Sequence, residues 1–327
     1  MPPMNLCRIS RHALFAVLLV AGTAAPAQNY PTHPIRLLVP STPGGSVDTF
    51  ARMIGSHLSE RWGQQVVIEN RPGAGGTIAA ELTAKAAPDG YTLIAGTVAA
   101  MATNVSIYRA LPYHPLKDFA PVTLIARQAL MLLVHPALPA RSVRDLIALA
   151  KSRPGQLSFA SAGNGSGGHL SAELFKLTAG IELQHVPYKG VAPAIVDVIS
   201  GQVEMTFSSI LSALPHVKSA RLRALAVTSA QRSAAAPDVP TMQQAGVAGF
   251  ESSTWYGVLA PGATPPEIVD KLYREISAGL RAPEARARIS AEGADPVGNT
   301  PAEFRAFIAA EIDKWAKVVK AAGIQPG

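Results

Sequence analysis

Residues 157–170 read LSFASAGNGSGGHL, an apolar run that breaks into a glycine-rich loop and then continues with helical spacing. This pattern predicts a strand, a turn and a helix in direct succession. Small residues let several backbone N–H groups converge at the N-terminus of the helix, where unpaired donors and the positive end of the dipole favour an anion. The loop therefore predicts a site for a phosphate or a carboxylate.

The same order of elements recurs along the chain. Residues 35–39 form an apolar run, the loop PSTPGGS follows at 40–46, and helical spacing then continues until Gly63. Another glycine turn, at 71–76, follows the predicted strand 66–68. Strands that alternate with helices predict parallel sheets with helices on both faces, and ligands bind such sheets beyond the carboxyl ends of the strands. The glycine loops lie at those ends.

Two segments interrupt this alternation. Residues 122–126 and 130–134 are apolar with little between them that could form a helix, and residues 233–240 are rich in proline and alanine. We interpret them as crossings between two α/β lobes. The expected division is residues 28–127 and 231–327 in lobe 1 and residues 128–230 in lobe 2.

The first 27 residues have the order of a secretory signal. Arg8 and Arg11 precede an apolar run from Ala13 to Ala24, and small residues end at Ala27. We expect cleavage near Ala27 and an exported mature protein. A membrane anchor is the weaker interpretation, because the run is shorter than the roughly 18 apolar residues that a spanning helix needs. The only cysteine, Cys7, lies in this leader, so the mature chain would have no disulfide.

The net positive charge of the chain does not by itself indicate a nucleic-acid partner. The formal net charge is +7, and loss of the two leader arginines would lower it to +5. Lysines and arginines are scattered instead of clustered, which is typical of a solvated basic surface. Export also argues against nucleic acid. A basic balance can nevertheless steer small anions toward a site.

Three enzyme or cofactor motifs fit the glycine loop poorly. Gly163, Gly165 and Gly168 match the dinucleotide pattern G-x-G-x-x-G, but the next predicted strand ends in PYKG and lacks the acid that would bind a ribose. No P-loop pattern is present. Asn164 occupies the place of the first glycine of a nucleophile elbow around Ser166. We therefore expect no cofactor.

Several single side chains have both structural and ligand-binding interpretations. No histidines show metal-ligand spacing, so we expect no metal. His169 falls in the first turn of the anion-facing helix, where it could shape the loop or contact the ligand. Asp48 has the same place in the first lobe, and we put a capping role ahead of ligand contact because an anionic ligand would be repelled. Thr97 and Ser208 follow strands and could donate hydroxyl hydrogen bonds into a cleft, although loop hydroxyls more often cap helices.

Eight short motifs occur in one order along the mature chain, and together they resemble the periplasmic solute-binding proteins of tripartite tricarboxylate transporters, also called Bug receptors. The motifs are PGGSVD at 43–48, ENRPGAGG at 69–76, PDGYTL at 88–93, KDFAPV at 117–122, the opening loop, HVPYKG at 185–190, LRALAV at 222–227 and PDVPT at 237–241.

This resemblance implies a type II periplasmic-binding-protein fold, in which two doubly wound lobes joined by two crossover segments close on a ligand in the cleft between them. It implies a periplasmic receptor without catalysis that captures a small organic carboxylate and delivers it to a membrane transporter. The ligand could be a di- or tricarboxylate, an acidic amino acid or an aromatic acid. A monomer is expected. A ligand-sensing subunit for a signalling protein and an exported enzyme using the same cleft are the alternatives.

The resemblance also implies that loop N–H groups and hydroxyls hold the ligand carboxylates. These groups map onto residues 41–46 of the first lobe and residues 161–166 of the second. No catalytic residue is predicted. The predicted ligand-binding residues are Ser41, Gly44, Gly45, Ser46, Asp48, Thr97, Ser161, Gly163, Asn164, Gly165, Ser166, His169, Tyr188 and Ser208.

Overall fold

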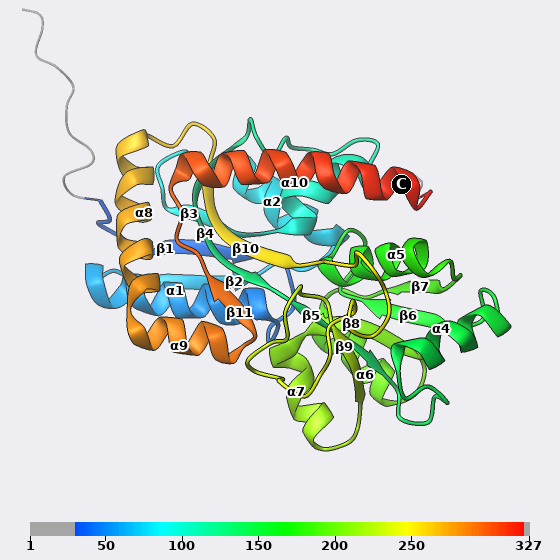
Figure 1. Ribbon diagram of the computed structural model, residues 1–327. Coiled ribbons are helices and arrows are strands. Elements are labelled where there is room, and N and C mark those ends of the chain that lie inside the picture. The colour runs from blue at the N-terminus through cyan, green and yellow to red at the C-terminus, as the bar shows by residue number, and fades with distance from the viewer. Residues whose placement is uncertain (1–29, 324–327) are drawn as a thin grey trace, which may run out of the picture. The chain divides into compact units, whose positions relative to one another are not determined.

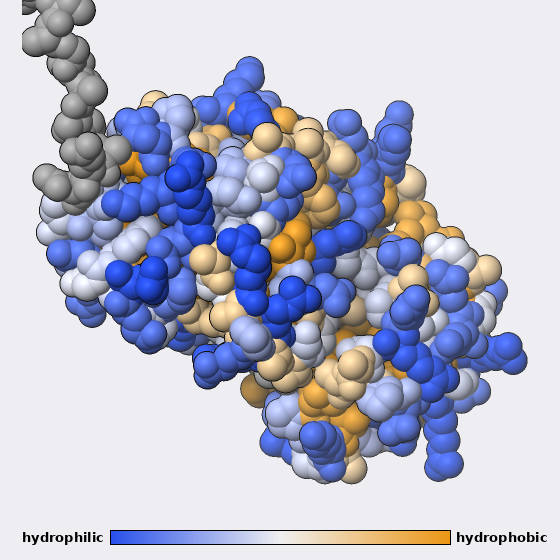
Figure 2. Space-filling view, turned by 60° about the vertical axis from the view of Figure 1, so that its left-hand side comes forward, coloured by the Kyte–Doolittle hydropathy of each residue, from blue (hydrophilic) through white to orange (hydrophobic). Residues whose placement is uncertain are grey.

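A computed structural model describes residues 30–323, which form two β-sheets with helices packed on both faces of each (Figure 1). The predicted secretory leader lies outside the described residues. Within the described range, no helix combines the length and the apolar character needed to cross a membrane. The face shown in Figure 2 is largely hydrophilic and is broken by separate hydrophobic patches.

The first sheet has the strand order β11-β4-β10-β3-β1-β2. Helices α1, α8 and α9 cover one face of it, and α2, α3 and α10 cover the other (Figure 1). We call this sheet with its helices the first lobe. Its strands are β1 (Ile35–Val39), β2 (Val66–Asn70), β3 (Thr92–Thr97), β4 (Phe119–Gln128), β10 (Thr254–Pro261) and β11 (Ala294–Pro296). Its helices are α1 (Ser46–Trp62), the 3₁₀ turn η2 (Ala74–Gly76), α2 (Thr77–Ala84), the π-helix η3 (Ala99–Thr103), α3 (Asn104–Ile107), α8 (Pro266–Arg281), α9 (Pro283–Ala291) and α10 (Pro301–Ala321).

The second sheet has the order β7-β6-β8-β5-β9. Separate apolar clusters fill the space on its two faces. We call this sheet with its helices the second lobe. Its strands are β5 (Leu130–Val134), β6 (Ser158–Ser161), β7 (Gln184–Pro187), β8 (Met205–Ser209) and β9 (Arg223–Val227), and its helices are α4 (Val143–Ser152), α5 (Gly167–Ala179), α6 (Val191–Ile199) and α7 (Ile210–Lys218).

Both sheets are mixed, whereas the alternation of strands and helices predicted parallel sheets. Strands β1, β2 and β3 are parallel, as are β6, β7 and β8, but β4, β5 and β10 pair antiparallel with their neighbours. Parallel pairing needs a long crossover, usually through a helix. The antiparallel strands are those that carry the chain between the lobes, with only residue 129 between β4 and β5. These strands and the return from β9 to β10 are the two predicted crossings.

The return segment packs largely on the second lobe. Met242, Val247 and Phe250 belong to the apolar cluster of the second sheet, and the ring of Phe250 stacks on Phe207 with the ring centroids 6.2 Å apart. Val227 also donates its backbone N–H to Pro240. The lobe boundary at residues 230 and 231 stays a prediction, but the side chains that follow it lie with the second core.

Helix α10 is anchored on the first sheet through a buried carboxylate. Glu311 Oε2 accepts hydrogen bonds from the indole N–H groups of Trp255 at 2.9 Å and Trp315 at 2.8 Å. The helix begins with a capping box formed by Thr300 and Glu303. Strand β10, which contains Trp255, is thereby held in place.

The two glycine loops occupy corresponding places in the two sheets. In each sheet the first parallel strand, β1 or β6, lies next to an edge strand and leads through a glycine loop into a helix, α1 or α5. The carboxyl end of a parallel strand and the N-terminus of the next helix lie on the same edge of the sheet. The N-termini of α1 and α5 therefore lie at the carboxyl edges of the parallel strands, as do those of α2, α6 and α7, which follow β2, β7 and β8.

Candidate ligand-binding site

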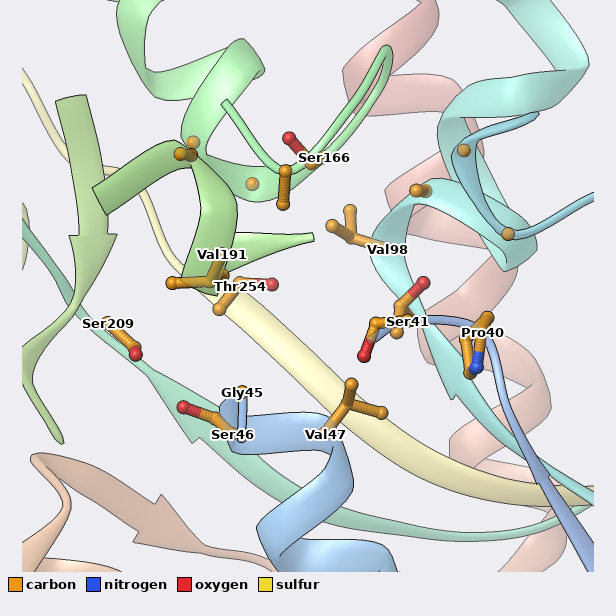
Figure 3. Close-up of a pocket in the computed structure, with 18 of the residues that line it drawn as sticks. Pro40, Ser41, Gly45, Ser46, Val47, Val98, Ser166, Val191, Ser209 and Thr254 are labelled. Carbon is orange, nitrogen blue, oxygen red and sulfur yellow. The ribbon is translucent and has the colours of Figure 1, made fainter. Parts of the chain in front are cut away.

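A cavity of about 130 Å³ lies between the loops and is lined by residues of both lobes. Figure 3 shows Ser41 and Ser46 of the first lobe facing Ser166, Val191 and Ser209 of the second. One water needs roughly 10–15 Å³, so the cavity has room for a molecule several times larger than water. A small organic acid is in that range.

The first loop ends in a helix whose N-terminus has no side-chain cap. Gly45 is the N-cap residue of α1, and Ser46, the first residue of the helix, is 2% exposed and lines the cavity. The first N–H groups of a helix have no partner within it. Donors and the positive end of the α1 dipole therefore lie at the cavity wall.

Asp48 holds this loop through hydrogen bonds without lining the cavity. Its carboxylate accepts the Gly44 N–H at 3.1 Å, two hydrogen bonds from Arg52 at 3.0 Å and one from Asn70 at 2.9 Å. Burial alone would raise the pKa of Asp48, but these hydrogen bonds outweigh it and the pKa lies below its usual value. The charged Asp48 is thus fully engaged, and it is not among the cavity-lining residues.

The second loop is built by side chains that bond to its own backbone. Ser166, the N-cap residue of α5, accepts the His169 N–H at 3.3 Å. Ser161 accepts the Gly163 N–H at 3.1 Å and lies 2.6 Å from His185 Nε2. Gly168 has to be glycine because an added Cβ would lie 2.5 Å from the carbonyl oxygen of Phe207. This close approach brings the α5 N-terminus against β8 and the cavity.

His169 corresponds to Asp48 in the second lobe. Its Nδ1 accepts the Gly165 N–H at 3.0 Å, and its ring stacks on His185 with the ring centroids 4.0 Å apart. Burial, with His185 and Lys176 nearby, lowers the pKa of His169 to about 3. The ring is therefore neutral at pH 7, so its 3.8 Å separation from Glu173 is not an ion pair. A neutral Nδ1 is required if it is to accept the loop N–H.

Two buried hydroxyls at the cavity have no hydrogen-bond partner of ordinary geometry, although the Tyr256 hydroxyl lies close to one of them, Ser46 Oγ. Ser46 Oγ lies on the first lobe and Ser208 Oγ on the second, and the residues are 2% and 3% exposed. Leaving a buried hydroxyl unpaired costs roughly 1–3 kcal/mol, so both are poised to bond with a ligand. Tyr188 lines the same space, and its hydroxyl donates to Asp197 at 2.6 Å.

The rest of the lining is mainly apolar and contains no acidic side chain. Val47, Val98, Leu130, Val191 and Phe207 supply the larger apolar surfaces. The lining contains a single charged side chain, the exposed Lys189. Within residues 30–323, no cluster of three or more histidine, aspartate or glutamate side chains could hold a metal ion.

The predicted site residues divide into two groups. The cavity is lined by Ser41, Gly45, Ser46, Thr97, Ser166, Tyr188 and Ser208. The remaining predicted residues do not line the cavity: Gly44, Asp48, Ser161, Gly163, Asn164, Gly165 and His169.

Sequence reasoning missed part of the lining. The turn at Gly73–Gly76 was recognised as a glycine turn but not as part of the site. Thr254 and Tyr256 come from β10, far along the chain, and no local pattern marked them. The other missed residues with polar side chains are Thr206, Lys189 and Ser209.

Comparisons with known proteins match almost the whole chain. Residues 50–324 match the family described as tripartite tricarboxylate transporter family receptor. The chain is 41% identical to Protein BugT of Bordetella pertussis over 324 residues, which cover 98% of this chain and 99% of the relative. The structure of R. palustris Rpa4515 with adipate is 43% identical with a TM-score of 0.89, covering 91% of this chain and 100% of that one. MatC (Rpa3494) from Rhodopseudomonas palustris with bound malate is 34% identical with a TM-score of 0.84, covering 89% and 100%.

Proposed function

This chain belongs to the tripartite tricarboxylate transporter receptor family, and from that premise we propose that it is a periplasmic receptor for a small aliphatic dicarboxylate without an ammonium group. The receptor captures the ligand between its lobes and delivers it to a membrane transporter of the same system. Export through the predicted leader, cleaved near Ala27, brings the mature chain to that compartment.

The observation that carries this proposal is the pair of unpaired hydroxyls, Ser46 and Ser208, on opposite sides of one cavity beside the N-termini of α1 and α5. Hydrogen bonds to a charged group contribute roughly 1.5–3 kcal/mol each. Four or five of them, less the costs of association, are sufficient for about −8 kcal/mol, which is a micromolar dissociation constant. Backbone N–H groups and hydroxyls can therefore bind carboxylates here without a buried lysine or arginine.

The apolar lining selects the middle of the ligand. Val47, Val98 and Val191 would contact methylene groups between two terminal carboxylates. An α-ammonium group would be buried beside these side chains without a carboxylate partner, and burying an unpaired charge is costly. The cavity thus favours an unsubstituted aliphatic diacid over the corresponding amino acid. The presence of adipate in the similar Rpa4515 structure makes adipate the first ligand to test.

Binding without catalysis is supported by the same lining. An enzyme that used this cleft would need an acid and a base within reach of the ligand. The cavity-lining set contains no aspartate, glutamate or histidine. A ligand that touches both lobes instead stabilises the closed arrangement, because it binds that arrangement more tightly than the open one.

The test centres on adipate and 2-aminoadipate, which differ by one ammonium group. Mature protein is titrated calorimetrically with adipate, malate and 2-aminoadipate, and NAD serves as the cofactor control. We expect adipate to bind with one site per chain and 2-aminoadipate to bind at least 10-fold more weakly. At 100 times its dissociation constant, adipate should add about 2.7 kcal/mol to the free energy of unfolding. Equal affinity for 2-aminoadipate would refute the selectivity, and binding of NAD alone would refute the receptor function.

A further inference from the structure

One side-chain hydrogen bond joins the two lobes outside the ligand cavity. Thr103 Oγ1, at the end of the π-helix η3 in the first lobe, donates to the carbonyl oxygen of Gly165 in the second-lobe loop at 2.8 Å. The same hydroxyl lies 3.4 Å from the Ala99 carbonyl and 3.5 Å from the Val98 carbonyl of its own helix. When the lobes separate, the hydroxyl can return to those acceptors. Thr103 is therefore not left unpaired in an open state.

The backbone of Gly165 is held on its other side by His169. The Gly165 N–H donates to His169 Nδ1 at 3.0 Å. This bond fixes the orientation of the loop and with it the direction of the Gly165 carbonyl. Thr103 and His169 thus act on the two polar groups of one residue, one from each lobe.

We propose that Thr103 and His169 are positioning residues for ligand binding, which act through Gly165 to couple closure of the lobes to the geometry of the second glycine loop. Neither side chain lines the cavity. Helix η3 links the two places directly, because Val98 and Ala99 at its start line the cavity and Thr103 at its end reaches Gly165. A ligand that holds the cavity wall therefore also favours the contact at the other end of the helix.

The two lobes pack closely against each other around the Thr103–Gly165 hydrogen bond. An added Cβ on Gly75 of the first lobe would lie 2.7 Å from the carbonyl oxygen of Asn164 of the second. Asn104, next to Thr103, donates to the Gly75 carbonyl at 3.1 Å, while its own Oδ1 is buried without a partner. The backbone of the first lobe at Gly75 therefore packs directly against the backbone of the second lobe at Asn164, and this contact forms only when the lobes are closed.

Closure contacts of this kind change affinity without touching the ligand. A bond present only in the closed state raises the closed population, and the apparent affinity scales with that population. Because the Thr103 hydroxyl has other acceptors in the open state, its loss should cost only part of a hydrogen bond. We expect Thr103→Val to weaken adipate binding about 3- to 10-fold.

The experiment uses the full mature chain and a matched control. Thr83→Val removes an equally buried threonine hydroxyl of the first lobe, which donates to Ala79 at 3.0 Å within α2. Calorimetric titration with adipate should show weaker binding for Thr103→Val and unchanged binding for Thr83→Val. Equal dissociation constants for wild type and Thr103→Val would overturn the proposal.

The role of His169 is tested by a rescue variant and by a double variant with Thr103. His169→Leu removes the acceptor and should weaken binding, whereas His169→Asn offers an amide oxygen in a similar place and should restore most of it. In the double variant, Thr103→Val should add little to His169→Leu, because a loop that has lost the Gly165 N–H bond no longer holds the Gly165 carbonyl in place for Thr103. Fully multiplicative losses would show that the two residues do not act through Gly165.

The inference rests on the proposed function for its affinity readout, so a second readout needs no ligand. Amide hydrogen exchange is measured for the segment 162–168 of the free protein. Thr103→Val should accelerate exchange there and Thr83→Val should not. If adipate fails to bind the wild type, the proposed ligand is wrong and exchange still tests the coupling. Unchanged exchange in Thr103→Val overturns the coupling whatever the ligand proves to be.

Discussion

Replacing Gly165 by alanine should have two separable effects, backbone strain that lowers stability and a steric conflict that hinders closure of the lobes. Gly165 has a φ of +72°, and an added Cβ would lie 2.5 Å from Thr103 Oγ1 and 3.0 Å from Ile107 Cδ1. Both neighbours belong to the first lobe, so the steric conflict exists only when the lobes are closed. The strain of a left-handed alanine exists in both states. Stability and affinity should therefore report different parts of the substitution.

The magnitudes follow from these two terms. Left-handed backbone costs an alanine about 1–2 kcal/mol, which the stiffer unfolded chain offsets by about 0.4–1 kcal/mol. Overpacking at the contact costs a further 1–3 kcal/mol or so in the closed state alone. At about 1.4 kcal/mol per tenfold, Gly165→Ala should bind adipate about 5- to 150-fold more weakly.

Gly180→Ala is the control that carries the strain without the conflict. Gly180 ends α5 with a φ of +62°, and nothing lies within 4 Å of an added Cβ. Both variants should lower the melting temperature by a few degrees in differential scanning calorimetry. Only Gly165→Ala should lose affinity in calorimetric titration with adipate. Equal affinity losses in the two variants, or none in Gly165→Ala, would refute the account of closure.

Three further predictions concern the hydroxyls, the histidine and the anchor of α10. Ser46→Ala and Ser208→Ala should each weaken adipate binding about 10-fold or more in calorimetric titrations. The melting temperature should stay nearly unchanged, since neither hydroxyl has a partner of ordinary geometry in the free protein. A lower melting temperature with unchanged affinity would contradict this. Because the folded pKa of His169 is depressed to about 3, the unfolded chain binds the extra proton between about pH 6.5 and 3, so stability falls as pH falls through this window. Urea titrations should show this slope reduced by up to about 1.4 kcal/mol per pH unit in His169→Phe, and an unchanged slope would exclude His169 as a source. Glu311→Leu leaves two indole N–H groups unpaired and should lower the free energy of unfolding by about 2–5 kcal/mol in urea titrations. The tryptophan emission should shift to the red. A variant with unchanged stability and unchanged emission would contradict the anchoring role of Glu311.

The sequence identified the loops of the site because each carries a local signal. The runs that become β1 and β6 end in glycine loops, and the helices that follow keep their apolar spacing. The chain could therefore be interpreted as two lobes with one anion-facing loop each. Family motifs across these loops added the class of ligand.

Other parts of the site depend on tertiary contacts that no local pattern contains. Thr254 and Tyr256 reach the cavity because β10 returns from the second lobe to the middle of the first sheet, pairing with β3 and β4. The antiparallel course of that strand was not predicted either. Long-range pairing follows from which strand fills the gap between β3 and β4, and the sequence of β10 alone does not specify its neighbours.

Asp48 and His169 show the limit of reading a motif by position alone. Each falls in the first turn of a helix beside an anion site, so each was a candidate contact. In the structure Asp48 accepts the Gly44 N–H and His169 accepts the Gly165 N–H, each four residues before it. Both therefore point at their own loops. Spacing placed them near the site, and only their hydrogen bonds assign them to holding the loops.

The most direct test of the two-loop carboxylate site is a crystal structure of the mature protein with adipate. We expect the ligand between the lobes, with one carboxylate within hydrogen-bond distance of Ser46 at the α1 N-terminus and the other on the second lobe at Ser208 or the α5 N-terminus. Its methylene groups should contact Val47, Val98 and Val191. Adipate bound elsewhere, or bound in the cleft with neither carboxylate at a helix N-terminus, would contradict it.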